Sequence, residues 1–396
     1  MSWSLKPLGE ILVQSGRDRA GDQDLPVLSI TMKYGLIDQA DKFKKRIASS
    51  DTSNYRIAYK NELVVGFPID EGVLGFQTKY PAGVVSPAYD IWKLRGETDS
   101  HIPYLERYLR SVQARSLYAS RMQGAVARRR SLTKTDFLNL EIPFPPIDEQ
   151  IRIAHLLGKV EALIAQRKQH LQQLDDLLKS VFLEMFGDPV RNEKGWDIQA
   201  CEKAMLDISS GTSYGGEDRS FESPEELGVL KISAVTKGTF APAEFKVVDQ
   251  AQITKKLRFV KRGDFLFSRA NTVELVAACC VVTQDYDQLF LPDKLWVLTL
   301  NEELLTPQFF NYLLKNKRYR DVVRNLASGG HDSMLNISMK KFMTLDVPCP
   351  PIELQNQFAG IVEKVEKIKN SYQKSLVNVE VLYGALSQQA FSADVS

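Results

Sequence analysis

Apolar residues recur at helical spacing along two long segments of this chain. In the first segment, two rows with a seven-residue period comprise Leu157, Ile164, Leu171, Leu178, Met185 and Ile153, Val160, Arg167, Leu174, Val181. In the second segment, the rows comprise Phe358, Val365, Tyr372, Val379, Leu386 and Val362, Leu376, Tyr383. This heptad pattern predicts long helices that pack against a partner. At 1.5 Å per residue, a helix from about Asp148 to Phe186 spans roughly 55 Å.

The two heptad segments are copies within an internal repeat. Residues 131–186 align without a gap to residues 336–391, at a constant offset of 336 − 131 = 205. A proline-rich stretch precedes each helix, so that Pro143, Pro145 and Pro146 recur as Pro348, Pro350 and Pro351. A single such helix is equally typical of an ordinary core. Two copies of one length favour an antiparallel coiled coil, in which Arg167 and Lys369 interrupt the seam and either set its register or extend to solvent.

The repeat continues more weakly upstream of the prolines. Residues 61–65 resemble 263–267, and residues 103–109 resemble 307–313. Each half therefore has a divergent body and a similar tail. The bodies combine short β-branched runs such as 277–283 and 295–300 with turns, and with helices expected near 103–118 and 306–326. We predict an α+β fold with a pseudo-two-fold repeat, divided into a body at 1–146, a helix at 147–189, a body at 190–351 and a helix at 352–396.

Composition is consistent with two ordinary domains. The chain has 396 residues, of which 44% are hydrophobic, and its 51 Lys and Arg nearly balance 49 Asp and Glu. A uniformly basic surface is thereby excluded, so any phosphate contact must come from local clusters. The four cysteines lack CxxC spacing, which favours buried thiols in a reducing cytosol. No apolar run approaches the roughly 18 residues of a membrane span, so we expect a cytoplasmic protein without a membrane partner.

Signatures of catalysis are missing from the sequence. There is no Walker A motif, no GxGxxG after a strand, no HExxH and no Cys/His cluster with metal spacing. An adenine methyltransferase would place Asn or Asp before Pro-Pro-aromatic, and residues 144–147 have neither group. We interpret that stretch as a stiff linker, because proline fixes φ. Pro292-Asp293-Lys294 lacks the second acidic residue of a nuclease motif. No catalytic or metal-binding residue is therefore expected.

Clusters of basic residues are the candidate DNA contacts, because Lys and Arg neutralise phosphates and bidentate Arg or Asn side chains read base edges. The clusters are Lys42, Lys44, Lys45, Arg46, then Arg128, Arg129, Arg130, then Lys255, Lys256, Arg258, Lys261, Arg262, and finally Lys315, Lys317, Arg318, Arg320, Arg324. Loop candidates are Tyr214 in the glycine-rich loop 211–216, Arg269 and Asn271 as base readers, and His331. For each cluster the alternative is a solvated face, and for His331 it is a plain turn.

The repeated tails resemble the specificity subunit of type I restriction-modification systems. The resemblance rests on residues 140–154, the heptads after them, Ser180-Val-Phe-Leu-Glu-Met-Phe-Gly-Asp-Pro189, and the second copy that ends at Ala390-Phe391. It covers the whole chain, although the bodies are only loosely similar. The second copy departs from the pattern because it lacks the Phe-Leu-Glu-Met-Phe-Gly-Asp-Pro ending and carries Lys369 in the seam.

The resemblance implies a protein that supplies sequence recognition and no chemistry of its own. Each body would be a target-recognition domain that reads half of a split double-stranded DNA site, and the helices would fix the gap between the halves. Two modification subunits with S-adenosylmethionine would dock against the helices, where apolar residues outside the seam include Leu156, Leu163 and Leu177. Restriction subunits would add ATP- and magnesium-dependent translocation and cleavage in a bacterial or archaeal cytoplasm. The cofactors would thus all belong to partners.

Two other interpretations remain open from the residues themselves. One is a repeat-containing scaffold whose bodies bind proteins, and the other is a DNA methyltransferase with an unrecognised site. DNA affinity that falls steeply with salt would separate DNA binding from the scaffold, and binding of S-adenosylmethionine to the isolated chain would indicate the methyltransferase.

Overall fold

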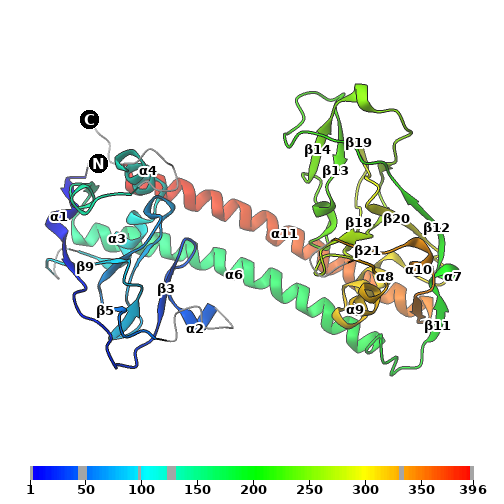
Figure 1. Cartoon of the computed structure of the whole chain (residues 1–396), viewed down its shortest axis with the longest axis horizontal. Coiled ribbons are helices and arrows are strands. Elements are labelled where there is room, and N and C mark those ends of the chain that lie inside the picture. Colours follow the sequence, from blue (N-terminus) through cyan, green and yellow to red (C-terminus); the bar gives the residue numbers. More distant parts are fainter. Residues whose placement is uncertain (1–2, 43–50, 97–99, 123–130, 330–333, 393–396) are drawn as a thin grey trace. The chain divides into compact units, whose positions relative to one another are not determined.

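Two compact units make up the chain. The structure is a computed structural model that describes residues 3–42, 51–96, 100–122, 131–329 and 334–392 (Figure 1). The first unit comprises residues 1–168 and 374–396, and the second comprises residues 169–373. Two 40-residue helices, α6 (Ile147–Phe186) and α11 (Ile352–Phe391), contribute a stretch to each unit. These are the two long helices that the heptads predict.

The first unit is centred on a four-stranded antiparallel sheet in the order β2 (Leu12–Ser15), β9 (Asp90–Leu94), β6 (Leu63–Val65), β7 (Leu74–Phe76). Two-stranded pairs join β1 (Leu5–Pro7) to β10 (Glu141–Pro143), β3 (Leu28–Thr31) to β4 (Gly35–Asp38), and β5 (Arg56–Tyr59) to β8 (Ala82–Val85). The short helices are α1 (Leu8–Ile11), α2 (Gln39–Lys42), η1 (Ile69–Glu71), α3 (Ile102–Leu109), α4 (Val112–Arg121) and α5 (Lys134–Leu138).

The second unit has a sheet of the same order, β12 (Met205–Ser210), β20 (Leu295–Leu300), β16 (Phe265–Ser268), β18 (Cys279–Val281). A further mixed sheet contains β14 (Phe245–Val248), β13 (Leu227–Leu230), β19 (Tyr286–Phe290) and β15 (Phe259–Val260). Two-stranded pairs join β11 (Asp197–Ala200) to β22 (Asp346–Cys349) and β17 (Ala270–Asn271) to β21 (Leu335–Asn336). The helices are α7 (Cys201–Ala204), η3 (Ile232–Val235), η4 (Gln250–Gln252), α8 (Pro307–Lys315), α9 (Lys317–Asn325) and α10 (Met339–Met343).

The α+β class and the duplication are confirmed, but two expected helices differ in detail. Each helix that the sequence predicts near 103–118 and 306–326 is broken in two. The breaks lie at capping residues: the Ser111 hydroxyl accepts a hydrogen bond from the Ala114 amide, and the Asn316 carboxamide oxygen accepts from the Arg318 and Tyr319 amides. Such side chains satisfy the free N–H groups of a new first turn, which starts a second helix at that point.

The proline-rich stretches are part of the bodies, and only their last residues match the expected stiff linker. Strands β10 and β22 lie in these stretches, and each pairs with the first strand of its own body. The double proline then leads directly into α6 or α11. In each copy a glutamine follows one turn into the helix, and both Gln150 and Gln355 are fully buried.

These two glutamines make matching hydrogen bonds. The Gln150 side chain donates to the Pro145 carbonyl (2.9 Å) and accepts from the His101 amide (2.9 Å), which precedes α3. The Gln355 side chain donates to the Pro350 carbonyl (2.8 Å) and accepts from the Thr306 amide (2.9 Å), which precedes α8. Each glutamine thus joins the start of a long helix to the start of a body helix.

Cross-helix contacts show that α6 and α11 pair antiparallel. In the first unit Arg167 donates to the Ser375 hydroxyl (3.1 Å), and the Tyr383 hydroxyl donates to Glu161 (2.8 Å), so partner numbers rise on one helix as they fall on the other. In the second unit the rings of Phe182 and Phe358 lie 5.6 Å apart. The antiparallel coiled-coil expectation is confirmed.

Lys369 lies in the seam of the second unit and does not reach solvent. Its ammonium is 2.8 Å from Asp175 on α6 and 2.8 Å from Glu366 on its own helix. Burial lowers the pKa of Lys369, but the hydrogen bonds to these two carboxylates outweigh burial and leave the pKa raised. A buried charge is tolerated when it is paired in this way, and the pairing favours one register of the helices.

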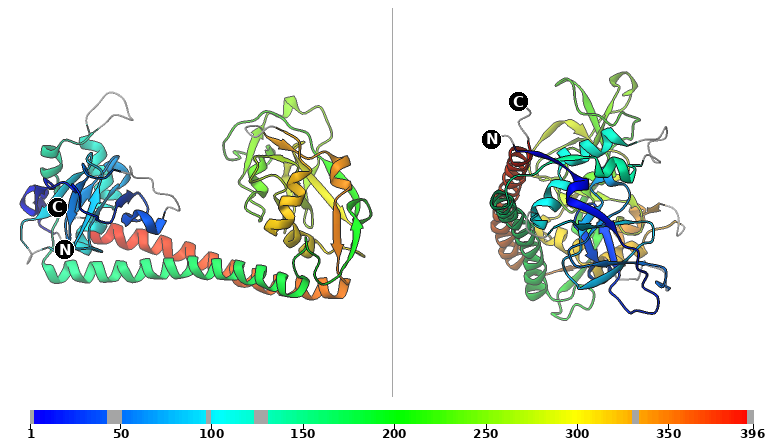
Figure 2. Two further views of the ribbon diagram at one scale, coloured as in Figure 1. Left: turned by 60° about the horizontal axis from the view of Figure 1, so that its bottom comes forward. Right: turned by 90° about the vertical axis from the view of Figure 1, so that its left-hand side faces the viewer.

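The C-terminal end of α11 lies against the body of the first unit (Figure 2), and aromatic side chains make the contact. Phe391, near the end of α11, packs edge-on against Tyr104 and Tyr108 of α3. Its repeat counterpart Phe186, at the end of α6, packs against Phe309 of α8. The body of each unit therefore shares one hydrophobic core with its own stretches of α6 and α11. Among the described residues, no helix has the length and apolarity needed to cross a membrane.

Candidate nucleic-acid interface

The glycine-rich loop 211–216 of the second unit lies directly on neighbouring strands. A Cβ on Gly211 would stand 1.7 Å from the carbonyl oxygen of Leu291, and one on Gly216 would stand 2.6 Å from that of Val247. The Thr212 amide donates to the Leu291 carbonyl at 3.0 Å. Glycine is needed at both ends because no side chain fits between the two backbones. The loop is therefore held in place against the mixed sheet.

Tyr214, at the centre of this loop, holds the backbone of the candidate Lys255. Its hydroxyl accepts from the amides of Thr254 (3.3 Å) and Lys255 (3.1 Å). Burial opposes ionisation of this hydroxyl, but the backbone donors outweigh it and lower the pKa of Tyr214. The side chains of Lys255 and Lys256 are exposed, so they are available to phosphates.

Arg269 and Asn271 are held by hydrogen bonds in the same unit. The Arg269 guanidinium donates to the Asp293 carbonyl (2.9 Å) and to the side chain of Asn336 (2.8 Å), and it lies 5.8 Å from the ring centre of Trp296. The side chain of Asn271 is buried and accepts from the Thr272 amide. Asp293 also meets the Ser213 hydroxyl. Polar groups from four segments thus converge here, and they include Ser213 and Asn336, which were not among the sequence candidates.

The basic residues of α8 and α9 are engaged inside the unit. Burial lowers the pKa of Lys315, which lies 4.9 Å from the ring centre of Tyr312. Arg318 is paired with Asp188. Burial also lowers the pKa of Arg320, whose guanidinium donates to the Val276 carbonyl. These three are therefore weaker candidates for phosphate contact than the exposed Lys255 and Lys256.

Several candidates fall outside the described residues. They are Lys44, Lys45, Arg46, Arg128, Arg129, Arg130 and His331. Lys42 ends α2, and its side chain likewise lies outside the description. The DNA contacts of these residues stay predictions.

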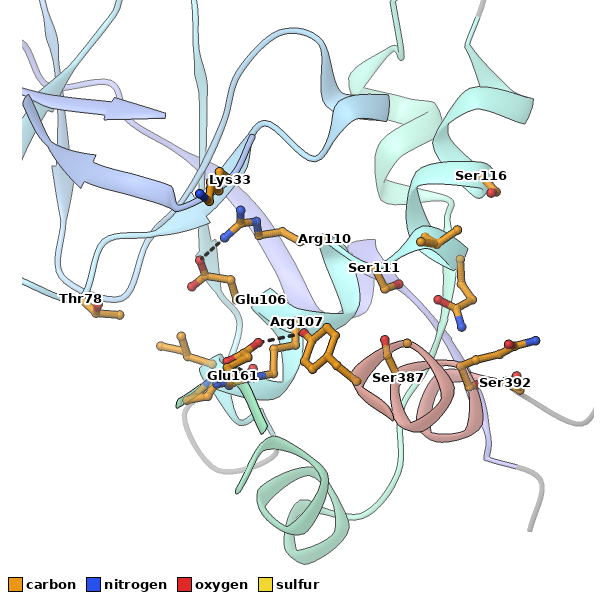
Figure 3. Close-up of a pocket in the computed structure, with 17 residues that line it drawn as sticks. Lys33, Thr78, Glu106, Arg107, Arg110, Ser111, Ser116, Glu161, Ser387 and Ser392 are labelled. Carbon is orange, nitrogen blue, oxygen red and sulfur yellow. Dashed lines mark hydrogen bonds and ion pairs between the residues drawn. The ribbon is translucent and has the colours of Figure 1, made fainter. Parts of the chain in front are cut away.

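A polar cleft of about 1,090 Å³ opens in the first unit between α3, α4 and the stretches of α6 and α11 (Figure 3). Among the residues that line it, Arg107 of α3 donates to Glu161 of α6 at 2.6 Å, and Glu161 also accepts from Tyr383 of α11. These hydrogen bonds link α6 and α11 to the body. On its wall Arg110 lies 3.8 Å from Glu106, and burial raises the pKa of this carboxyl. These charges mainly hold the unit together.

The row of apolar residues outside the seam is solvent-exposed on α6. Leu156, Leu163 and Leu177 are 40%, 43% and 47% exposed. Their spacing of one and two heptads places them on one face of the helix. An apolar row of this kind on a surface helix is typical of a protein-binding face.

Each unit joins a mixed body to stretches of α6 and α11, and comparison with known proteins finds the same architecture. Residues 9–175 match the family model described as the type I restriction modification DNA specificity domain. The chain is similar to this family over that segment, and the relatives that match it are type I specificity subunits.

Relatives and solved structures are distant but consistent. The type I restriction enzyme EcoKI specificity subunit of Escherichia coli K12 is 24% identical over 297 residues, which cover 71% of this chain and 64% of that subunit. The chain thus spans less than two thirds of the length of this relative. The crystal structure of the type I system S subunit from M. genitalium has a TM-score of 0.57 at 12% identity, and covers 100% of this chain and 97% of that one. A chain from a structural study of complex assembly in the type I R-M system gives 0.57 at 16% identity, and covers 100% and 98%.

The pinned glycine loop gives a direct test of the site geometry. Gly211→Ala forces a methyl group into the Leu291 carbonyl, so we expect the free energy of unfolding to fall by about 1–3 kcal/mol. The matched control is Gly215→Ala in the same loop, where a Cβ would meet nothing within 4 Å and where we expect little change. Urea denaturation of both variants measures the difference. Equal midpoints would contradict the described loop.

Proposed function

We propose that this chain is the subunit that reads DNA in a type I restriction-modification complex, where it recognises a split double-stranded site. Residues 1–146 and 190–351 serve as target-recognition domains, and α6 (Ile147–Phe186) and α11 (Ile352–Phe391) serve as spacer helices. The observation that carries the proposal is one sheet order, β2-β9-β6-β7 and β12-β20-β16-β18, built twice on one pair of helices. Two domains with the same sheet order but different loops are suited to binding two different DNA sequences.

The long helices set the gap between the two half-sites in this proposal. Each has 40 residues and a length of about 60 Å at 1.5 Å per residue. DNA advances about 3.4 Å per base pair. In this proposal, helix length therefore sets the number of base pairs between the half-sites, and side chains in the loops do not.

The chemistry belongs to partner subunits. Two modification subunits with S-adenosylmethionine methylate adenines, and restriction subunits supply ATP- and magnesium-dependent cleavage in the cytoplasm of a bacterial or archaeal cell. The chain itself holds none of these cofactors. Its part is to bind DNA and to hold the modification subunits through the exposed row on α6.

Salt dependence tests DNA binding and locates the phosphate contacts. Each phosphate that is neutralised contributes about −0.9 to the slope of log affinity against log salt concentration. The double variant Lys255→Ala/Lys256→Ala should bind duplex DNA more weakly and reduce that slope by about 1–2. Lys315→Met is the control, because its ammonium is buried and its loss should leave the slope unchanged.

Fluorescence anisotropy on duplex DNA at several salt concentrations provides the measurement. A wild-type slope near zero would contradict the proposed function and favour a protein scaffold. A normal slope for the double variant would remove these lysines from the interface.

Assembly tests the second part of the proposal. Replacing Leu156, Leu163 and Leu177 together by Glu places charges on the exposed row of α6, and should abolish co-purification with the modification subunit while DNA binding by the chain persists. Leu206→Glu is the control, since Leu206 is 68% exposed and belongs to β12, not to a long helix. Retained assembly by the triple variant would show that this row is not the docking face.

A further inference from the structure

In each unit a tryptophan of the central four-stranded sheet packs against a phenylalanine. We call this pair the aromatic support, and the surface next to it the corner of the sheet. In the first unit Trp92 of β9 lies 5.3 Å from Phe137, measured between ring centres. In the second unit Trp296 of β20 lies 5.8 Å from Phe342, the repeat counterpart of Phe137. Strands β9 and β20 hold the same place in their sheets, and β6 and β16 are their neighbours. The support is therefore common to the two bodies.

The segments that cover this support differ between the units. In the second unit Arg269 follows β16, lies 5.8 Å from the ring centre of Trp296 and donates to Asn336, and the next strand, β17, pairs with β21. In the first unit the corresponding segment, residues 66–69 after β6, borders a small hollow that Trp92 and Phe137 also line. A constant support with a variable cover is the arrangement expected where two domains read different sequences on one frame.

Phe67 is the residue that the first unit presents at this corner. It is 61% exposed, whereas Ile69, two residues further on, is buried. The backbone on both sides is fixed: the Gly66 amide donates to the Val73 carbonyl (2.9 Å), and the Asp70 carbonyl accepts from the side chain of Arg115 (2.8 Å). A ring on a fixed backbone loses little conformational entropy on binding, which favours its use as a contact.

Charged and polar groups beside Phe67 fit a nucleic acid. Asp90 lines the same hollow and lies 3.0 Å from Lys134 and 3.8 Å from Arg56, so the corner carries two cations for one carboxylate. The Lys134 side chain is 48% exposed. The indole N–H of Trp92 is buried and has no hydrogen-bond partner among the described residues. Aromatic rings next to cations are typical of surfaces that contact bases and phosphates together.

We propose that Phe67 is a specificity-determining residue of the first recognition domain, and that its ring packs against the bases of one half-site while Lys134 meets an adjacent phosphate. This inference rests on the proposed function. In the corresponding corner of the second domain, Arg269 and Asn336 offer polar contacts in place of the ring. The two half-sites are thus read by different chemistry at corresponding corners, an apolar contact in the first and hydrogen bonds in the second.

Affinity of substituted chains for DNA tests the inference. The full chain, assembled with its modification subunits, is titrated with duplex DNA that carries the site methylated by the wild-type complex. Phe67→Ala should weaken binding about tenfold to a hundredfold, the range for loss of one aromatic contact with a base, and should leave the salt slope unchanged. Phe67→Tyr keeps the ring and should bind within a few fold of wild type. Val112→Ala is the control, because Val112 is 72% exposed in the same unit but lines the polar cleft instead.

Photo-crosslinking gives a second readout that does not depend on truncating the side chain. A benzophenone analogue of phenylalanine at position 67 should crosslink to DNA bases, and the same analogue at position 112 should not. Crosslinks from position 67 to a modification subunit, or none at all, would overturn the inference, as would unchanged affinity of Phe67→Ala. Failure of the wild-type complex to bind DNA would instead overturn the proposed function on which the inference rests.

Discussion

One set of hydrogen bonds, made by a buried glutamine in each copy, determines how each body is joined to a long helix. We call this set the glutamine clamp. Gln150 and Gln355 are fully buried, and each bonds to the proline stretch before it and to the residue that caps the start of a body helix. A buried amide that lost either partner would cost about 1–3 kcal/mol, so body and helix keep one geometry. Within each unit, the body therefore keeps a fixed position on its own stretch of long helix.

The seam and the aromatic anchors act together with this clamp. Lys369 pairs with Asp175 across the helices, and Phe391 and Phe186 bury the helix ends in the bodies. These contacts lie within each unit, and the aromatic contact is alike in the two copies, since Phe186 is the repeat counterpart of Phe391. The duplication therefore preserves the frame, while the surfaces above Trp92 and Trp296 have diverged.

The long helices and the duplication could be predicted from the sequence. A heptad period reflects the packing of one helix on another, and a gapless repeat reflects two copies of one fold. The predicted helix start at Asp148 is one residue from the observed start at Ile147. The breaks at Ser111 and Asn316 were missed, since capping competes with a continuous apolar pattern. Charge runs did not predict which basic side chains have partners within the chain: Lys315 lies against the ring of Tyr312, and Arg318 is paired with Asp188, a residue 130 positions away. The exposure of Phe67 depends on packing around its neighbours, which no local pattern encodes.

Exchange of one body tests the central claim that each domain reads one half-site independently. Residues 1–140 are replaced by the first body of another family member, and the chimaera is expressed with the native modification subunits. Sequencing of methylated DNA then reports the recognised motif. The account predicts that one half of the motif changes while the other half and the gap stay the same. A change in both halves, or an unchanged motif, would contradict it.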